Sequence, residues 1–175
     1  MTDQTRVVTH QVRRLEVAAD LPFEELRARY EQAVPAFDPG HYFGGLAPDR
    51  IDWATISRIT EKQAPHGFLL YWRNEADQMM RVAGHDRRCT TYLMGNHVVA
   101  ERMYRHDPGI LLYAPLRVTL YEDHDGGVWF AVDQPSTRFS SFGDPEIAAV
   151  GVELDGKLAD LFSTLGIAVP DELTH

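Results

Sequence analysis

Two stretches of alternating hydrophobic and polar residues follow each other in the second half of the chain. They cover residues 116–123 and 127–133 and meet at the segment Asp123-His124-Asp125-Gly126-Gly127. Asp-Gly and Gly-Gly pairs favour the positive φ angles that a tight turn needs. The pattern therefore predicts a β-hairpin whose first strand turns Leu116, Val118 and Leu120 toward the core.

Three more segments have the composition of strands. Residues 7–17, 67–74 and 88–94 are rich in β-branched and aromatic side chains, which fit a pleated surface. We interpret residues 79–83 as a candidate partner for the strand at 67–74. The first strand has polar residues interleaved along one face, so we expect it near an edge of the sheet.

Helices are predicted where apolar residues recur every three or four positions. These segments are residues 22–34, a helix from Asp49 or Asp52 to Lys62, a short helix after Asn96, and a long helix from Pro145 to Leu165. Gly151 and Gly156 lie inside the long helix, where each glycine costs about 1 kcal/mol relative to alanine. We therefore expect close backbone packing at both.

Residues 35–49 form an irregular segment with an unusual composition. They contain three prolines and three glycines together with Phe37, Tyr42 and Phe43. Aromatic side chains in such a segment indicate either an Ω-type loop that plugs the flank of the domain or a functional lid. With the helix that follows, residues 35–66 are predicted to be a loop-helix insertion or lid.

Composition narrows the class of protein. At 175 residues, 44% hydrophobic and 25% charged, the chain has the length and composition of one globular domain over residues 1–175. The formal charge of −9 repels phosphate backbones, so we do not expect nucleic acid as a partner.

The one cysteine, Cys89, excludes an intramolecular disulfide and fits a reducing compartment. The sequence has no apolar run of about 18 residues and no signal-peptide pattern, so we expect no membrane association and a cytoplasmic location.

The outer face of the predicted hairpin is the first candidate site. It carries Arg117, Thr119, Tyr121 and Trp129, which is too aromatic for bulk water and too polar for a plain core. A ligand surface or a subunit interface would account for this composition.

The eight histidines give a second candidate. None lies four residues from another, so no pair shares a helix face in the way metal ligands do, and we predict no metal site. His97 and His106 bracket the short helix after Asn96. They are the candidates for axial ligation if haem is bound.

Several segments together resemble the domain of unknown function DUF302. They are Met94-Gly95-Asn96, Asp107-Pro108, the run from Leu112 to Val118, Tyr121-Glu122-Asp123, Asp133-Gln134-Pro135 and Gly143-Asp144-Pro145-Glu146-Ile147-Ala148. The resemblance is clearest over residues 90–165 and weaker before residue 85. Many members have a proline after the Gly-Asn pair, where this chain has His97.

The resemblance implies a fold and leaves the chemistry open. It implies a compact α+β fold of the TT1751-like type, in βα…ββαββα order, with a single antiparallel sheet and helices packed on one face. It also implies a homodimer. Such sheets often enclose a small-molecule cavity, and the family supplies no catalytic residues.

Our leading hypothesis is a dimeric small-molecule-binding protein with its pocket on the polar and aromatic sheet face. Arginine would hold an anionic group and aromatic rings an apolar body. The predicted ligand-binding residues are Tyr71, Arg88, Tyr92, Arg117, Tyr121 and Trp129. The alternatives are a cofactor-dependent enzyme that uses His97 or His106, and a structural dimer in which the mixed face is the subunit interface.

Overall fold

The computed structural model describes residues 5–44 and 51–174 and contains one five-stranded sheet with the order β1-β5-β4-β3-β2. All neighbouring strands are antiparallel. The strands are β1 (Arg14–Ala19), β2 (Leu69–Asn74), β3 (Cys89–Gly95), β4 (Leu116–Glu122) and β5 (Val128–Asp133). The predicted hairpin is thus confirmed as β4 and β5.

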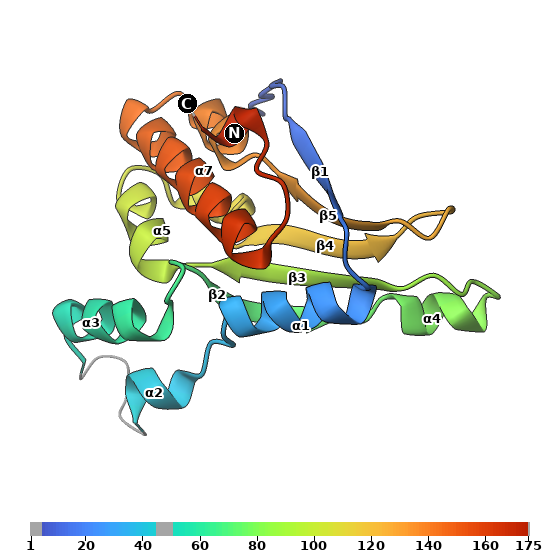
Figure 1. Ribbon diagram of the computed structural model, residues 1–175. Coiled ribbons are helices and arrows are strands. Elements are labelled where there is room, and N and C mark those ends of the chain that lie inside the picture. Colours follow the sequence, from blue (N-terminus) through green and yellow to red (C-terminus); the bar gives the residue numbers. More distant parts are fainter. Residues whose placement is uncertain (1–4, 45–50, 175) are drawn as a thin grey trace.

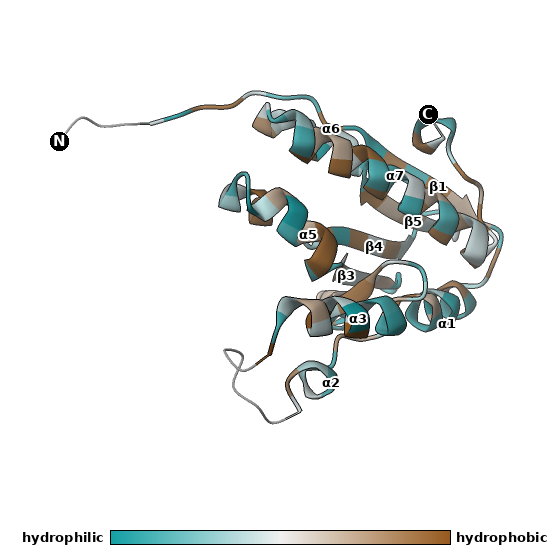
Figure 2. Ribbon diagram, turned by 90° about the vertical axis from the view of Figure 1, so that its left-hand side faces the viewer, coloured by the Kyte–Doolittle hydropathy of each residue, from teal (hydrophilic) through white to brown (hydrophobic). Residues whose placement is uncertain are grey.

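Helices precede, follow and connect these strands (Figure 1). They are α1 (Phe23–Ala33), α2 (Pro39–Phe43), α3 (Trp53–Gln63), α4 (Asp77–Val82), α5 (His97–Tyr104), α6 (Pro135–Phe139) and α7 (Pro145–Leu165), with a 3₁₀ turn at Pro108–Leu112 between α5 and β4. In Figure 2, α6 and α7 lie together in the upper part of the view, near β1 and β5, and α2 and α3 lie in the lower part. The predicted α+β class and the single antiparallel sheet are confirmed.

Along β4 and β5, one face of the sheet is covered and the other is open. Along β4 and β5 the buried positions alternate strictly, so Leu116, Val118 and Leu120 enter the core while Arg117 is exposed. The covered face packs against α1 and α7 in one hydrophobic core. The period of two in the sequence therefore separates a core face from an open face.

The long helix α7 has the signals that its sequence predicts. Asp144 caps the first turn by accepting hydrogen bonds from the backbone N–H groups of Glu146 and Ile147. Gly166 ends the helix at φ 74°, a left-handed conformation that glycine adopts without a steric penalty. Leu154, Leu158, Leu161, Phe162 and Leu165 are buried along its inner face.

Helices α2 and α3 build a second, smaller hydrophobic cluster beside β2. Its buried members are Tyr42, Ile56, Ala64 and Leu69, with Phe37 packed against them. The N-cap of α3 is Asp52, whose side chain accepts from the Thr55 N–H. Asp49, the alternative cap, and the central part of the predicted 35–66 insertion or lid lie outside the described residues.

Two strand predictions are wrong. Residues 79–83 belong to helix α4 and the turn after it, and β1 begins at Arg14, so residues 7–13 lie outside the sheet. Asp77 starts α4 and forms an ion pair with Arg81, four residues later, at 2.6 Å. This local pairing favours a helix over the strand that the apolar run indicates.

A β-bulge changes the faces of β2. The strand pairs Leu70 with Met94 but Trp72 with Leu93, so Tyr71 is an extra residue with no opposite partner on β3. The expected alternation places Leu70 and Trp72 on the same face. The bulge instead turns Trp72 to the open face and Arg73 to the covered face, because an inserted residue inverts every position after it.

No helix within the described residues is both long and apolar enough to cross a membrane.

Alanine substitutions at the two glycines inside α7 should change the stability of the protein in opposite directions. A Cβ added to Gly151 would lie 3.0 Å from Cα of Ser136 and 3.1 Å from Cβ of Phe139, whereas Gly156 has nothing within 4 Å. Close packing is therefore confirmed at Gly151 and wrong at Gly156. We expect Gly151→Ala to lower the free energy of unfolding by about 1–3 kcal/mol through overpacking against α6. Gly156→Ala should raise it by up to about 1 kcal/mol. Urea denaturation measures both, and an equal effect of the two variants would contradict the packing at Gly151.

Candidate functional site

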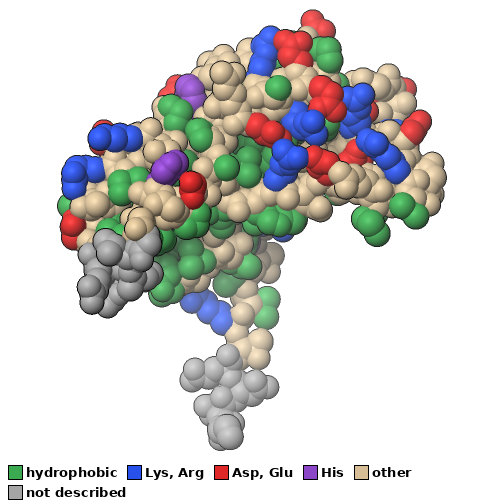
Figure 3. Space-filling view, turned by 90° about the horizontal axis from the view of Figure 1, so that it is seen from below, with side chains coloured by type: hydrophobic (Ala, Val, Ile, Leu, Met, Phe, Trp, Pro, Cys, Tyr) green, Lys and Arg blue, Asp and Glu red, His purple; other side chains and the backbone are tan. Residues whose placement is uncertain are grey.

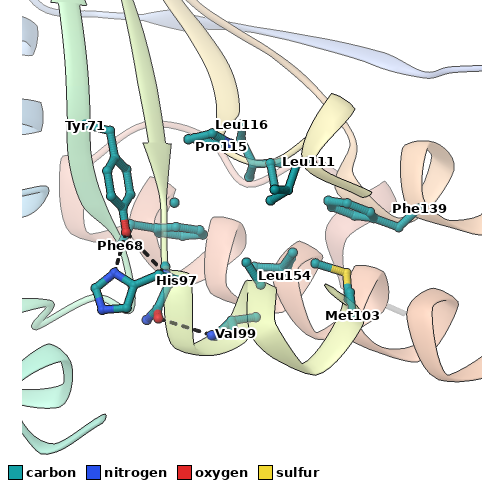
Figure 4. A pocket seen from close by; sticks show the side chains of 14 residues that line it. Phe68, Tyr71, His97, Val99, Met103, Leu111, Pro115, Leu116, Phe139 and Leu154 are labelled. Carbon is teal, nitrogen blue, oxygen red and sulfur yellow. Dashed lines mark hydrogen bonds between the residues drawn. The ribbon is translucent and has the colours of Figure 1, made fainter. Parts of the chain in front are cut away.

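A cavity of about 210 Å³ lies at the end of the sheet where β3 finishes and β4 begins. Figure 4 shows Tyr71 and His97 at one end of it and Met103 and Phe139 at the other. Nearly all of its wall is apolar, formed by Phe68, Val99, Ala100, Met103, Leu111, Ala114, Pro115, Leu116, Phe139 and Leu154. An apolar hollow with a few polar groups at one end is the usual form of a small-molecule site.

The start of α5 places His97 at this wall. Asn96 is the N-cap, and its side-chain oxygen accepts hydrogen bonds from the N–H groups of Val98 and Val99 at 2.9 and 3.2 Å. The Asn96 amide donates to the carbonyl of Gly67 at 3.0 Å, which ties the helix start to the beginning of β2. His97 is therefore fixed as the first helical residue.

The bulge in β2 places Tyr71 opposite His97. A bulged residue has no ladder partner, so its side chain can be aimed away from the regular alternation. The Tyr71 hydroxyl lies 2.6 Å from His97 Nδ1, and it also accepts a hydrogen bond from the His97 backbone N–H at 3.2 Å. Tyr71 and His97 thus form a doubly hydrogen-bonded pair.

The hydrogen bonds favour one tautomer of His97. The Thr60 hydroxyl donates its hydrogen to the carbonyl of Ile56 at 2.9 Å, so toward His97 Nε2, at 2.7 Å, it can act only as an acceptor. Nε2 then carries the proton, and Nδ1 accepts the Tyr71 hydroxyl proton. In this arrangement the imidazole is neutral and both ring nitrogens have protein partners.

Burial keeps this pair in its neutral form. It lowers the pKa of His97 and, as the largest cause, raises the pKa of Tyr71 to about 12. Phe37 stacks on Tyr71 with ring centroids 5.0 Å apart, and Tyr42 meets the His97 ring edge-on at 5.0 Å. These rings come from the segment between α1 and α3, and they shield the pair from water on that side.

The arrangement suits a neutral, apolar guest. No lysine, arginine, aspartate or glutamate lines the cavity within the described part of the chain. The backbone N–H groups at the start of α5, which could bind an anion, are already taken by Asn96 and Tyr71. Apolar contact is therefore the main interaction that the cavity offers.

The structure separates the residues that the sequence assigns to one ligand site. Arg117, Tyr121 and Trp129 share the open face of the sheet, with Tyr121 opposite Trp129. Tyr121 donates to Glu16 at 3.0 Å and Trp129 donates to Asp123 at 2.6 Å. Tyr71 alone among the six predicted residues lines the apolar cavity.

Tyr92 and Arg88 lie away from that open face. Tyr92 pairs with Val118 and is fully buried on the covered face, where its hydroxyl donates to Glu31 at 2.8 Å. Arg88 contacts Glu24 at 3.0 Å and lies over the ring of Phe23. Basic and acidic side chains interleave over part of the face of the molecule that Figure 3 shows. Tyr92 and Arg88 therefore do not join the predicted site on the open face. Tyr92 lies on the same face of the sheet as its partner Val118, and Arg88 lies before the first residue of β3.

The two candidate haem ligands are differently placed. His97 lines the cavity, and a metal bond through either ring nitrogen would displace Tyr71 or Thr60. His106 follows α5, and its Nδ1 lies 3.3 Å from Asp144, the cap of α7. Over the described residues, no group of three or more His, Cys, Asp or Glu side chains is arranged to hold a metal ion. A role in haem ligation stays a prediction.

Sequence reasoning missed most of the cavity. Its lining residues Met103, Phe139 and Leu154 come from three different helices, and nothing in their local spacing indicates that they meet. Thr60, the partner of His97, comes from a fourth helix. The signals that could be read were Asn96 as an N-cap, which places His97, and the aromatic residues of the 35–49 segment.

Comparisons with known proteins agree with this fold. A family model described as "Domain of unknown function DUF302" matches residues 53–165. The chain is similar to a crystal structure of an uncharacterized conserved DUF302 protein from Bacillus stearothermophilus. The TM-score is 0.62 at 14% identity, over 87% of this chain and 97% of that one. No curated protein matches the sequence.

The neutral state of His97 predicts a pH dependence of stability. The pKa of His97 is lowered in the folded protein, so between about pH 6.5 and the folded pKa the unfolded chain binds the proton and the folded chain does not. Stability from this group is complete above about pH 6.5 and decreases as the pH falls toward the folded pKa. We expect wild type to lose more free energy of unfolding than His97→Gln between pH 7 and pH 5. Urea denaturation at each pH measures the difference, and parallel pH profiles would contradict a neutral, buried His97.

Proposed function

The chain belongs to the DUF302 family, and from the structure of its cavity we propose that it binds a small molecule with an apolar body. The observation that carries the proposal is the apolar hollow of about 210 Å³ with the Tyr71–His97 pair at its end. This location differs from the open sheet face that the sequence analysis favours. The proposed activity, binding of a small molecule, is the one that the sequence suggests, but the proposed site lies at the end of the sheet.

The size of the hollow supports a guest. Protein interiors are packed to the density of organic crystals, and voids larger than a water molecule are few. A dry cavity of 150 Å³ is enough to hold benzene, so about 210 Å³ admits a somewhat larger ring or a short chain. Burial of apolar surface would then be the main source of affinity.

The polar end adds a directional preference. The Tyr71 oxygen donates to His97 Nδ1 and accepts the His97 N–H, which leaves it one lone pair as an acceptor. A guest that reaches this end can donate one hydrogen bond there. Inside the cavity, the hydroxyl of an alcohol or phenol is therefore favoured over a charged group.

Filling the cavity should abolish binding. Ala100 lies on the cavity wall in α5, and Ala100→Leu would place three extra carbons in the hollow. We expect wild type to bind phenol and toluene and the variant to bind both at least 10-fold more weakly, as measured by NMR titration. Ala149→Leu is the matched control, because Ala149 is an exposed position on α7 that does not line the cavity.

Two outcomes bear directly on the proposal. Equal binding by wild type and Ala100→Leu, or no binding by either, would overturn the cavity as the site. Native mass spectrometry of freshly purified protein gives an independent check, because a retained molecule adds mass to the chain of 19.8 kDa.

We also propose the homodimer that the resemblance implies. Large apolar side chains are exposed on β2 and on the following helix α4, among them Trp72, Met79 and Val82. Exposed apolar side chains on consecutive elements are typical of a contact surface. A second copy of the chain is the partner that the proposal names.

A charge on α4 should dissociate this dimer. Val82 is 85% exposed, so Val82→Glu should leave the fold intact while it places a carboxylate in the contact. We expect light scattering to give twice the chain mass for wild type and the chain mass for the variant at the same concentration. Val152→Glu on α7, where Val152 is 52% exposed, is the control and should stay dimeric. A monomeric wild type would contradict the dimer.

A further inference from the structure

We propose that the guest of the apolar cavity is a carboxylate with an apolar body, and that its charged end is held outside the cavity by Arg117. This inference rests on the proposed function, since the apolar body occupies the same cavity. It adds the chemical class of the ligand and a second group of binding residues.

A second hollow lies on the other side of the cavity wall. Its volume is about 330 Å³, and its polar lining is formed by Arg117, Arg138, Asp133 and Tyr113. Arg117 is on the open face of β4, one residue after Leu116, whose side chain faces the core. This hollow therefore begins where the open face of the sheet reaches its end.

The charges of this second hollow leave Arg117 without an internal partner. Asp133 pairs with Arg138 and lies 3.9 Å from Arg14, and the Arg138 guanidinium stacks over the Tyr113 ring at 4.8 Å. Among the residues that the structure describes, no carboxylate lies within 4 Å of Arg117, although the chain carries a formal charge of −9. Two arginines, Arg117 and Arg138, thus line this hollow with one aspartate. Asp133 is paired with Arg138, so Arg117 is the one free to bind an anion.

The two hollows share part of their wall. Leu111, Pro115 and Leu116 line both, and the Leu111 side chain is half-exposed, so this residue lies at the rim where both hollows reach solvent. A molecule with its body in the cavity can therefore extend across Leu111 and place its end near Arg117. The step is short, because Leu116 and Arg117 are consecutive residues.

The distribution of polar groups selects the ligand class. The cavity holds no charged residue, so any charge on the ligand must lie outside it. The group outside is a guanidinium, whose planar fork of N–H donors matches the two oxygens of a carboxylate. A cation would be repelled at this end, and a purely apolar molecule would leave Arg117 unused.

Octanoate and octan-1-ol test this inference as a pair with the same number of carbons. We expect wild type to bind octanoate about 3- to 10-fold more tightly than octan-1-ol, the range of a partly exposed charge-assisted pair. Arg117→Gln should bring octanoate to the affinity of the alcohol and leave the alcohol unchanged. Isothermal titration calorimetry at low salt measures all four affinities.

Two controls separate this inference from the proposed function. Arg87→Gln removes the same charge at an exposed position just before the far end of β3 and should change neither affinity. Ala100→Leu should weaken both ligands. Binding of octan-1-ol with no gain for octanoate, or octanoate binding that Arg117→Gln leaves unchanged, would overturn the carboxylate while the cavity stands. Octanoate binding that survives Ala100→Leu would show an ion site at the surface only, and binding of neither ligand would overturn both proposals.

Discussion

The burial of one sheet face by α1 and α7 is the constraint on which the rest of this structure depends. Each of the buried leucines, valines and phenylalanines on that face contributes about 1.5–3 kcal/mol relative to exposure. The strands can supply such residues at every second position only if their register is kept. On β4, the side chains that face the other way are released from this packing, and this is why Arg117, Thr119 and Tyr121 can be polar.

The cavity arises where this regular alternation stops. At the end of the sheet the bulge removes Tyr71 from the ladder, and Gly95 has no side chain to occupy the space. A Cβ at Gly95 would lie 3.3 Å from Cβ of Pro115 and 3.6 Å from the Tyr71 ring. A larger residue at this position would therefore crowd the wall between the cavity and the strand. The site therefore depends on the inserted residue Tyr71 in β2 and on the absence of a side chain at Gly95 in β3.

The sequence predicts the parts of the fold that local patterns control. The hairpin, the cap at Asp144 and the period of α7 are all local, because each depends on residues within a few positions of one another. The bulge at Tyr71 is set by a register on another strand, so the sequence of β2 alone indicates the wrong face for Trp72. The same limit explains why Tyr92 appears as a ligand residue. An aromatic residue such as Tyr92 is common both in a core and at a ligand site, so its identity does not indicate which face of the strand it occupies.

The candidate site depends even more on distant contacts. His97 can be placed from the sequence because Asn96 caps α5, but its two partners, Thr60 and Tyr71, lie 37 and 26 residues away in the chain. The histidine alone suggests metal ligation or acid–base chemistry. Only the partners reveal a ring whose two nitrogens are both hydrogen-bonded within the protein, and this supports the proposal of binding.

Residues that precede α3 also contribute to the polar end of this cavity. Phe37 and Tyr42 surround the Tyr71–His97 pair, yet both precede residues 53–165, the part that the family model matches. Aromatic rings exclude water from hydrogen bonds that they cover, and a hydrogen bond in such surroundings is stronger than one in water. The pair is therefore shielded from water by residues that precede the part matched by the family model. It follows that the polar end of the cavity is shaped in part by Phe37 and Tyr42, which precede the matched residues, whereas the apolar wall, from Phe68 to Leu154, lies within them.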